Sequence, residues 1–125
     1  MGIDVYLRWD LQTDEQVDQQ LCGFRTDRGN AGYLREAYHG EPYATRLLVP
    51  AAFDPDRAAP VSVSASTLRD RLPAAMSATI ERERTLYNDP MPNEDTPAVK
   101  SMAEFVELAT KLEDAGLAFT VEASW

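Results

Sequence analysis

The sequence predicts an α+β fold, in which a small, mainly antiparallel sheet includes both terminal strands and is packed on one face by three to four helices. Two patterns indicate this fold. Apolar and polar residues alternate near both ends of the chain, as in strands with one buried face. Between the ends, helix caps and apolar residues spaced three and four apart indicate helices. A chain of 125 residues has the length of one domain, so we expect residues 1–125 to form a single globular domain.

The first strand and the first helix are predicted near the N-terminus. The strand alternates apolar side chains with more polar ones, and its apolar residues are Ile3, Val5, Leu7 and Trp9. A capping box follows, because Thr13 precedes Gln16 by three residues. Gly23 supplies the left-handed residue that ends many helices, so we expect a helix over 14–22.

The middle of the chain predicts two further strands. Residues 44–49, with the sequence Ala-Thr-Arg-Leu-Leu-Val, predict a third strand that ends at Pro50. Val61 and Val63 predict a short edge strand. Residues 31–39 fit either a short helix or a strand, because their apolar residues suit both periods.

A long helix is predicted after these strands. Pro73 suits the first turn of a helix over 74–87, so residues 67–71 are expected to form a separate turn. The apolar stripe of this helix consists of Leu72, Met76, Ile80 and Tyr87.

The last helix has the clearest periodicity, and its apolar residues are Met102, Phe105, Val106, Ala109 and Leu112. Two starts remain open. Thr96 with Pro97 is one, and Ser101 with Glu104 as a capping box is the other. Gly116 ends the helix and leads into the final strand. The apolar side of that strand is Leu117, Phe119, Val121 and Ala123.

Charge and composition exclude some classes of function. The formal net charge is −9, and acidic surfaces repel phosphate backbones, so nucleic-acid binding is not expected. No apolar run has the length of a membrane span, and the N-terminus lacks the features of a secretory signal. Cys22 is the only cysteine, so no intrachain disulfide forms. We therefore expect a cytoplasmic protein without a membrane partner.

Residues 23–46 differ in composition from the rest of the chain. They contain four of the six glycines, three of the five tyrosines and the only histidine. Glycines let a ligand approach the backbone, tyrosines offer flat apolar area, and arginines bind anions. This mixture predicts a site for a small anionic or nucleotide-like ligand, or for an acidic protein partner. The candidate residues are Arg25, Arg28, Tyr33, Arg35, Tyr38, His39, Tyr43 and Arg46.

The same composition also has a purely structural interpretation. Tyrosines often pack at the rim of a core, and arginines pair with carboxylates such as Asp27, Glu36 and Glu41. Gly29 and Gly32 do not form a phosphate loop, since the flanking Gly and Lys-Ser/Thr of that motif are missing. No zinc-ligand spacing occurs in a chain with one histidine and one cysteine, so we expect neither a metal nor a cofactor.

Three functional hypotheses follow. The leading one is a small, non-enzymatic, homo-oligomeric binding protein whose site lies within residues 25–46. The first alternative is a small enzyme, with His39 and Glu36 as acid and base and Arg35 as the anion-binding group. The second alternative is a structural or partner-binding subunit with an exposed apolar patch around a tryptophan.

Overall fold

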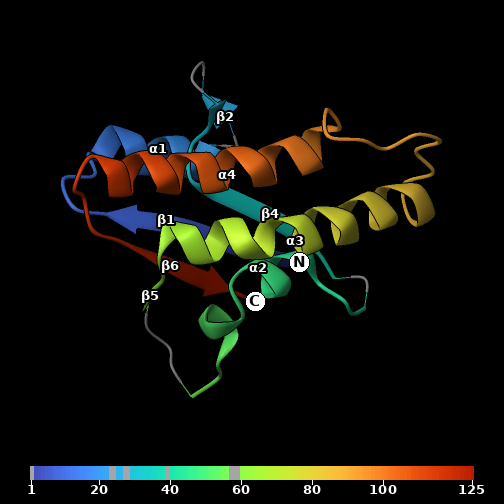
Figure 1. Ribbon diagram of the computed structural model, residues 1–125, viewed down its shortest axis with the longest axis horizontal. Coiled ribbons are helices and arrows are strands. Elements are labelled where there is room, and N and C mark those ends of the chain that lie inside the picture. Colours follow the sequence, from blue (N-terminus) through green and yellow to red (C-terminus); the bar gives the residue numbers. More distant parts are fainter. Residues whose placement is uncertain (1, 23–24, 27–28, 39, 57–59) are drawn as a thin grey trace.

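The computed structural model describes residues 2–22, 25–26, 29–38, 40–56 and 60–125 (Figure 1). The elements, in chain order, are β1 (Gly2–Trp9), α1 (Asp14–Cys22), β2 (Arg25–Thr26), β3 (Gly29–Asn30), β4 (Tyr33–Ala37), α2 (Ala44–Leu48), a 3-10 turn (Pro50–Phe53), β5 (Val61–Ser62), α3 (Ala65–Thr85), α4 (Pro97–Asp114) and β6 (Phe119–Ser124).

The larger sheet brings both ends of the chain together. Its strand order is β4-β1-β6-β5, and each neighbouring pair is antiparallel. β1 therefore lies between β4 and β6, with Asp4 opposite Arg35 on one side and Ser124 on the other. β2 and β3 form a separate two-stranded sheet. The predicted α+β class is confirmed, with both terminal strands in one small antiparallel sheet.

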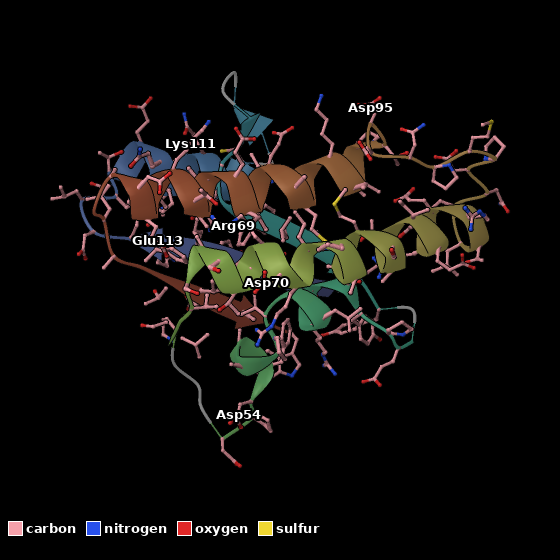
Figure 2. The ribbon with its side chains drawn as sticks, in the orientation of Figure 1. Asp54, Arg69, Asp70, Asp95, Lys111 and Glu113 are labelled. Atoms are coloured by element: carbon pink, nitrogen blue, oxygen red, sulfur yellow. The ribbon has the colours of Figure 1, made fainter. Side chains whose placement is uncertain are left out.

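α3 and α4 run side by side across one face of this sheet (Figure 1). Two labelled side chains in Figure 2 connect the helices. Arg69 donates to the hydroxyl of Thr110 at 2.9 Å, and Glu113 accepts the backbone N–H of Ala65 at 2.9 Å. The core lies between the helices and the sheet, and its largest fully buried side chains include Ile3, Leu7, Leu48, Leu68 and Phe105.

Several predicted elements are confirmed. α1 has the predicted bounds, and the Thr13 hydroxyl accepts the Gln16 N–H at 3.1 Å while Gln16 Oε1 accepts the Thr13 N–H at 2.9 Å. α4 starts at Pro97 after the N-cap Thr96, the first of the two predicted starts, and it buries the predicted apolar face. The short edge strand is β5. Among the described helices, none combines the length and the apolar composition needed to cross a membrane.

Residues 31–39 resolve as a strand at their centre, so the helical alternative is excluded. β4 pairs with β1, and Leu34 and Glu36 point inward while Tyr33, Arg35 and Ala37 point outward. The backbone hydrogen bond from the Leu7 N–H to the Gly32 carbonyl, at 2.8 Å, continues the β1–β4 pairing beyond β4. Pairing with β1 therefore decides a segment whose periodicity was ambiguous.

The predicted third strand over 44–49 is wrong, because residues 44–48 form the short helix α2. The buried residues of α2 are Ala44, Thr45 and Leu48, and Leu48 lies about one helical turn beyond the first two. The carboxylate of Glu36 accepts the first backbone N–H groups of α2, which stabilises a helix start at this position.

The predicted start of the long helix is also wrong. α3 begins at Ala65, so residues 67–71 are helical, and Ser64 caps the helix by accepting the Thr67 N–H at 3.1 Å. Pro73 lies inside α3 on its exposed side, where the carbonyl left without the proline N–H faces solvent rather than the core. The buried face is also rotated from the predicted stripe and consists of Ala65, Leu68, Ala75, Thr79 and Arg82.

Candidate functional site

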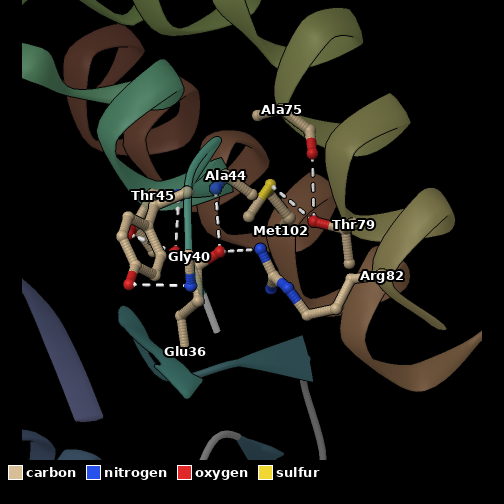
Figure 3. Close-up of polar contacts among 9 residues, drawn as sticks. Glu36, Gly40, Ala44, Thr45, Ala75, Thr79, Arg82 and Met102 are labelled. Atoms are coloured by element: carbon tan, nitrogen blue, oxygen red, sulfur yellow. Dashed lines mark hydrogen bonds and ion pairs between the residues drawn. The ribbon is translucent and has the colours of Figure 1, made fainter. Parts of the chain in front are cut away.

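Glu36 is a buried carboxylate that connects three elements (Figure 3). It points inward from β4, and its side chain is 1% exposed. One carboxylate oxygen accepts the backbone N–H of Ala44 at 2.8 Å, and the other accepts the backbone N–H of Thr45 at 3.0 Å together with the Thr45 hydroxyl. Arg82 forms an ion pair with the same carboxylate. Glu36 therefore joins β4, α2 and α3.

These contacts keep Glu36 ionised. Burial by itself raises the pKa of a carboxyl group, because the charged form loses its water. The hydroxyl and N–H of Thr45, the charge of Arg82 and the N–H of Ala44 outweigh burial, so the pKa of Glu36 lies below its ordinary value. A carboxylate already accepting this many hydrogen bonds has little capacity to take a proton from a substrate.

Arg82 is the cation of the site, and its side chain is 8% exposed. A guanidinium carries five N–H donors, and Arg82 donates to Glu36 through Nη2. Within the described part of the chain, the Nε of Arg82 is buried and has no hydrogen-bond acceptor. Such a donor is destabilising unless another group accepts its hydrogen bond.

A cavity of about 370 Å³ lies between β4, α3 and the start of α4, and we name it the β4–α3–α4 cavity. Leu34, Pro97 and Met102 give it an apolar lining, while Arg82 and Ser101 contribute polar groups. Further polar side chains also line the cavity, and they are Arg35, Glu36, Thr45, Thr79, Glu83 and Thr96. Cavities of this size that combine apolar surface with polar groups are typical of small-molecule sites.

The first turn of α4 forms part of the cavity wall through Thr96, Pro97 and Ala98. Thr96 is the N-cap, but its side chain makes no cap hydrogen bond. Its hydroxyl instead accepts the backbone N–H of Asn93 at 3.0 Å. The N–H groups of a first turn have no acceptor inside the helix and carry partial positive charge. The helix start and Arg82 therefore both favour an anion in the cavity.

Two predicted site residues lie on the opposite face of the sheet. Arg35 donates to Asp4 at 2.8 Å, and the Tyr33 hydroxyl donates to the same carboxylate. The Tyr33 ring stacks on Tyr6 with 5.1 Å between ring centroids. Burial and then the hydrogen bond to Asp4 raise the pKa of Tyr33 to about 12. Arg35 contributes to the β4–α3–α4 cavity wall, but its guanidinium is paired on the other face of β4.

Three more predicted site residues gather near α2. The guanidinium of Arg46 lies 5.2 Å from the ring centroid of Tyr43, and it pairs with Glu41 at 3.4 Å. The rings of Tyr38 and Tyr43 meet edge to face at 6.4 Å. The predicted segment is thus divided among the open sheet face, the β4–α3–α4 cavity and the surface of α2. His39, Arg28 and the side chain of Arg25 lie outside the described residues.

Sequence reasoning missed Arg82, Thr79 and Ser101. The Thr79 hydroxyl donates to the Ala75 carbonyl at 3.0 Å and contacts the sulfur of Met102 (Figure 3). Thr79 and Arg82 continue the buried face of α3 at helical spacing from Ala75. The helical spacing of these residues could therefore have identified them in the sequence. The prediction failed because it assumed that only apolar residues lie on the buried face of the helix.

Within the described ranges, no group of three or more His, Cys, Asp or Glu side chains is placed to hold a metal ion. Comparison of the chain with protein-family models, with curated proteins and with solved structures found no match.

Proposed function

We propose that this protein binds a small molecule with an anionic group and an apolar body in the β4–α3–α4 cavity. The observation that carries the proposal is the guanidinium of Arg82, which is almost fully buried beside this cavity and has an N–H donor without an acceptor in the described structure. An anion that accepts hydrogen bonds from Arg82 removes this cost.

The chemistry of the neighbouring groups favours a carboxylate. The oxygens of Glu36 already accept from two backbone N–H groups, a hydroxyl and Arg82, so Glu36 has little capacity for the remaining donors of Arg82. The planar guanidinium matches a planar carboxylate. The first turn of α4 adds partial positive charge at the cavity wall.

The apolar part of the cavity determines the rest of the ligand. Leu34 and Pro97 line it together with Met102, whose unbranched thioether side chain is apolar and adapts its shape to a ligand. A short hydrocarbon chain fits this lining and gains the usual stabilisation of apolar surface removed from water.

The test uses hexanoate as the probe and isothermal titration calorimetry as the measurement. We expect hexanoate to bind and to raise the Tm, and 1-hexanol, which lacks the charge, to bind more weakly. Ala98→Trp fills the cavity from an exposed position and should abolish binding. Ala74→Trp, at an exposed position of α3 outside the cavity lining, should bind like the wild type. Absent hexanoate binding, or unchanged binding by Ala98→Trp, contradicts the proposal.

Location and assembly extend the proposal. The exposed, unpaired thiol of Cys22 suits the reducing cytoplasm. Tyr38, Leu47 and Trp125 are exposed apolar side chains, of a kind common at subunit contacts, so we also propose that the protein forms a homo-oligomer. The net charge of −9 supports the further proposal that it does not bind nucleic acid. Light scattering on a size-exclusion column checks this, and a strictly monomeric protein contradicts it.

A further inference from the structure

Glu83 is a second charged group on the wall of the β4–α3–α4 cavity. It follows Arg82 directly on α3, and its side chain is half-buried. Among the described residues, Glu83 makes no salt bridge and its carboxylate accepts no hydrogen bond. The cavity wall therefore offers an anionic group without a partner beside a cation with a free donor.

A neighbouring carboxylate increases the negative potential at Glu83. The backbone N–H of Asp89 donates to the Glu83 carbonyl at 3.0 Å, which keeps the two residues together beyond the end of α3. Burial and then the charge of Asp89 raise the pKa of Glu83, while the charge of Arg82 lowers it. Ionised Glu83 is thus in an unfavourable setting that a nearby cationic group would improve.

Resting on the proposed function, we infer that the ligand is a zwitterion with the chemistry of an apolar α-amino acid. Its carboxylate lies at Arg82 and its ammonium group at Glu83. An α-amino acid carries its ammonium and carboxylate groups on the same carbon, and Arg82 and Glu83 present the complementary charges from consecutive residues of α3. The apolar side chain of the ligand then lies against Leu34 and Met102.

Charge balance favours the zwitterion over a simple anion. Arg82 is already paired with Glu36, so an added monocarboxylate places a further negative charge near Glu83 and Asp89. The ammonium group of an amino acid compensates this charge and donates a charge-assisted hydrogen bond.

The experiment compares L-norleucine with hexanoate, which differs from it only by lacking the ammonium group. In the wild type we expect norleucine to bind about tenfold more tightly, as one charge-assisted hydrogen bond predicts. In Glu83→Gln we expect this preference to disappear while hexanoate binds at least as tightly as before. Glu81→Gln is the matched control, because Glu81 pairs with Arg84 at 2.8 Å on the exposed side of α3, and it should keep the preference.

The outcomes separate the two proposals. Equal binding of norleucine and hexanoate by the wild type overturns the zwitterion and leaves the anion site intact. A preference for norleucine that survives in Glu83→Gln also overturns it, because the ammonium group then lies elsewhere. Binding of neither compound overturns both proposals. Circular dichroism of each variant verifies that it is folded.

Discussion

β4 carries one arginine–carboxylate pair on each of its faces, and the two pairs differ mainly in burial. On the open face, Arg35 and Asp4 lie 2.8 Å apart, with side chains that are 45% and 22% exposed. On the inner face, Arg82 and Glu36 have side chains that are 8% and 1% exposed. The N–H groups of Arg35 that do not donate to Asp4 can hydrogen-bond to water, whereas the remaining N–H groups of the buried Arg82 have little access to water.

The difference shows how the same chemistry serves two purposes. An exposed pair contributes little to stability, because water competes with it and salt screens it. A buried pair connects distant elements, and removing one partner leaves a charge without compensation. The inner pair therefore provides both the internal connection of β4, α2 and α3 and the unsatisfied donor on which the proposed ligand site depends.

The largest expected effect is that of Glu36→Gln, which leaves the Arg82 charge buried without a counterion. We expect the free energy of unfolding to fall by about 3–5 kcal/mol, measured by urea denaturation. Glu41→Gln is the control, because it removes the exposed partner of Arg46 and should cost less than about 1 kcal/mol. Equal losses in the two variants would contradict the distinction between buried and exposed pairs.

The pH dependence of stability sharpens this result. The pKa of Glu36 is lowered from its ordinary value of 4.5 in the folded protein. Its contribution is therefore complete above pH 4.5 and is lost as the pH falls through the lowered pKa. We expect the stability difference between the wild type and Glu36→Gln to shrink in acid below that value. Urea denaturation over a series of acidic pH values measures it, and a constant difference would show that Glu36 does not titrate this way.

Thr45→Val tests one neutral contact of the same cluster. The substitution keeps the shape of the side chain but removes the hydroxyl that donates a hydrogen bond to Glu36. We expect a loss of about 1–3 kcal/mol in the free energy of unfolding, because the buried carboxylate loses a donor. Thr85→Val removes an exposed hydroxyl that donates to the Glu81 carbonyl and should be nearly neutral. A neutral effect of Thr45→Val would mean that the backbone N–H groups alone satisfy Glu36.

Much of the fold could be predicted because local signals and tertiary packing agree. The capping box at Thr13 and the apolar face around Phe105 determine α1 and α4 locally. Residues 44–48 were predicted incorrectly because an apolar run suits both strand and helix, and the decision comes from Glu36. Local periodicity contains no information about a carboxylate supplied from a neighbouring strand.

The candidate site was predictable only in part, for a similar reason. The compositional signal at residues 23–46 includes Glu36 and three other residues of the cavity wall, which are Leu34, Arg35 and Thr45. Arg82, however, is 46 residues away from Glu36 in the sequence. Composition can indicate an unusual segment, but it cannot identify the residue that tertiary packing places opposite it.

The smallest expected effect concerns the open face and the ionisation of Tyr33. Burial and then the hydrogen bond to Asp4 raise the pKa of Tyr33 to about 12 from an ordinary value of 10.0. This contribution to stability is therefore present below pH 10 and is lost as the pH rises toward 12. In Asp4→Asn, we expect the pKa of Tyr33 to fall toward 10 but to stay above it, because burial remains.

A spectroscopic titration of tyrosinate absorbance measures this shift, and Tyr33→Phe identifies which transition belongs to Tyr33. Glu122→Gln is the matched control, because it removes a carboxylate that pairs with Arg8 on the same face at 3.3 Å. It should leave the Tyr33 transition in place. If Asp4→Asn leaves this transition unchanged, the hydrogen bond to Asp4 does not raise the pKa of Tyr33. Burial alone would then account for the raised pKa of Tyr33.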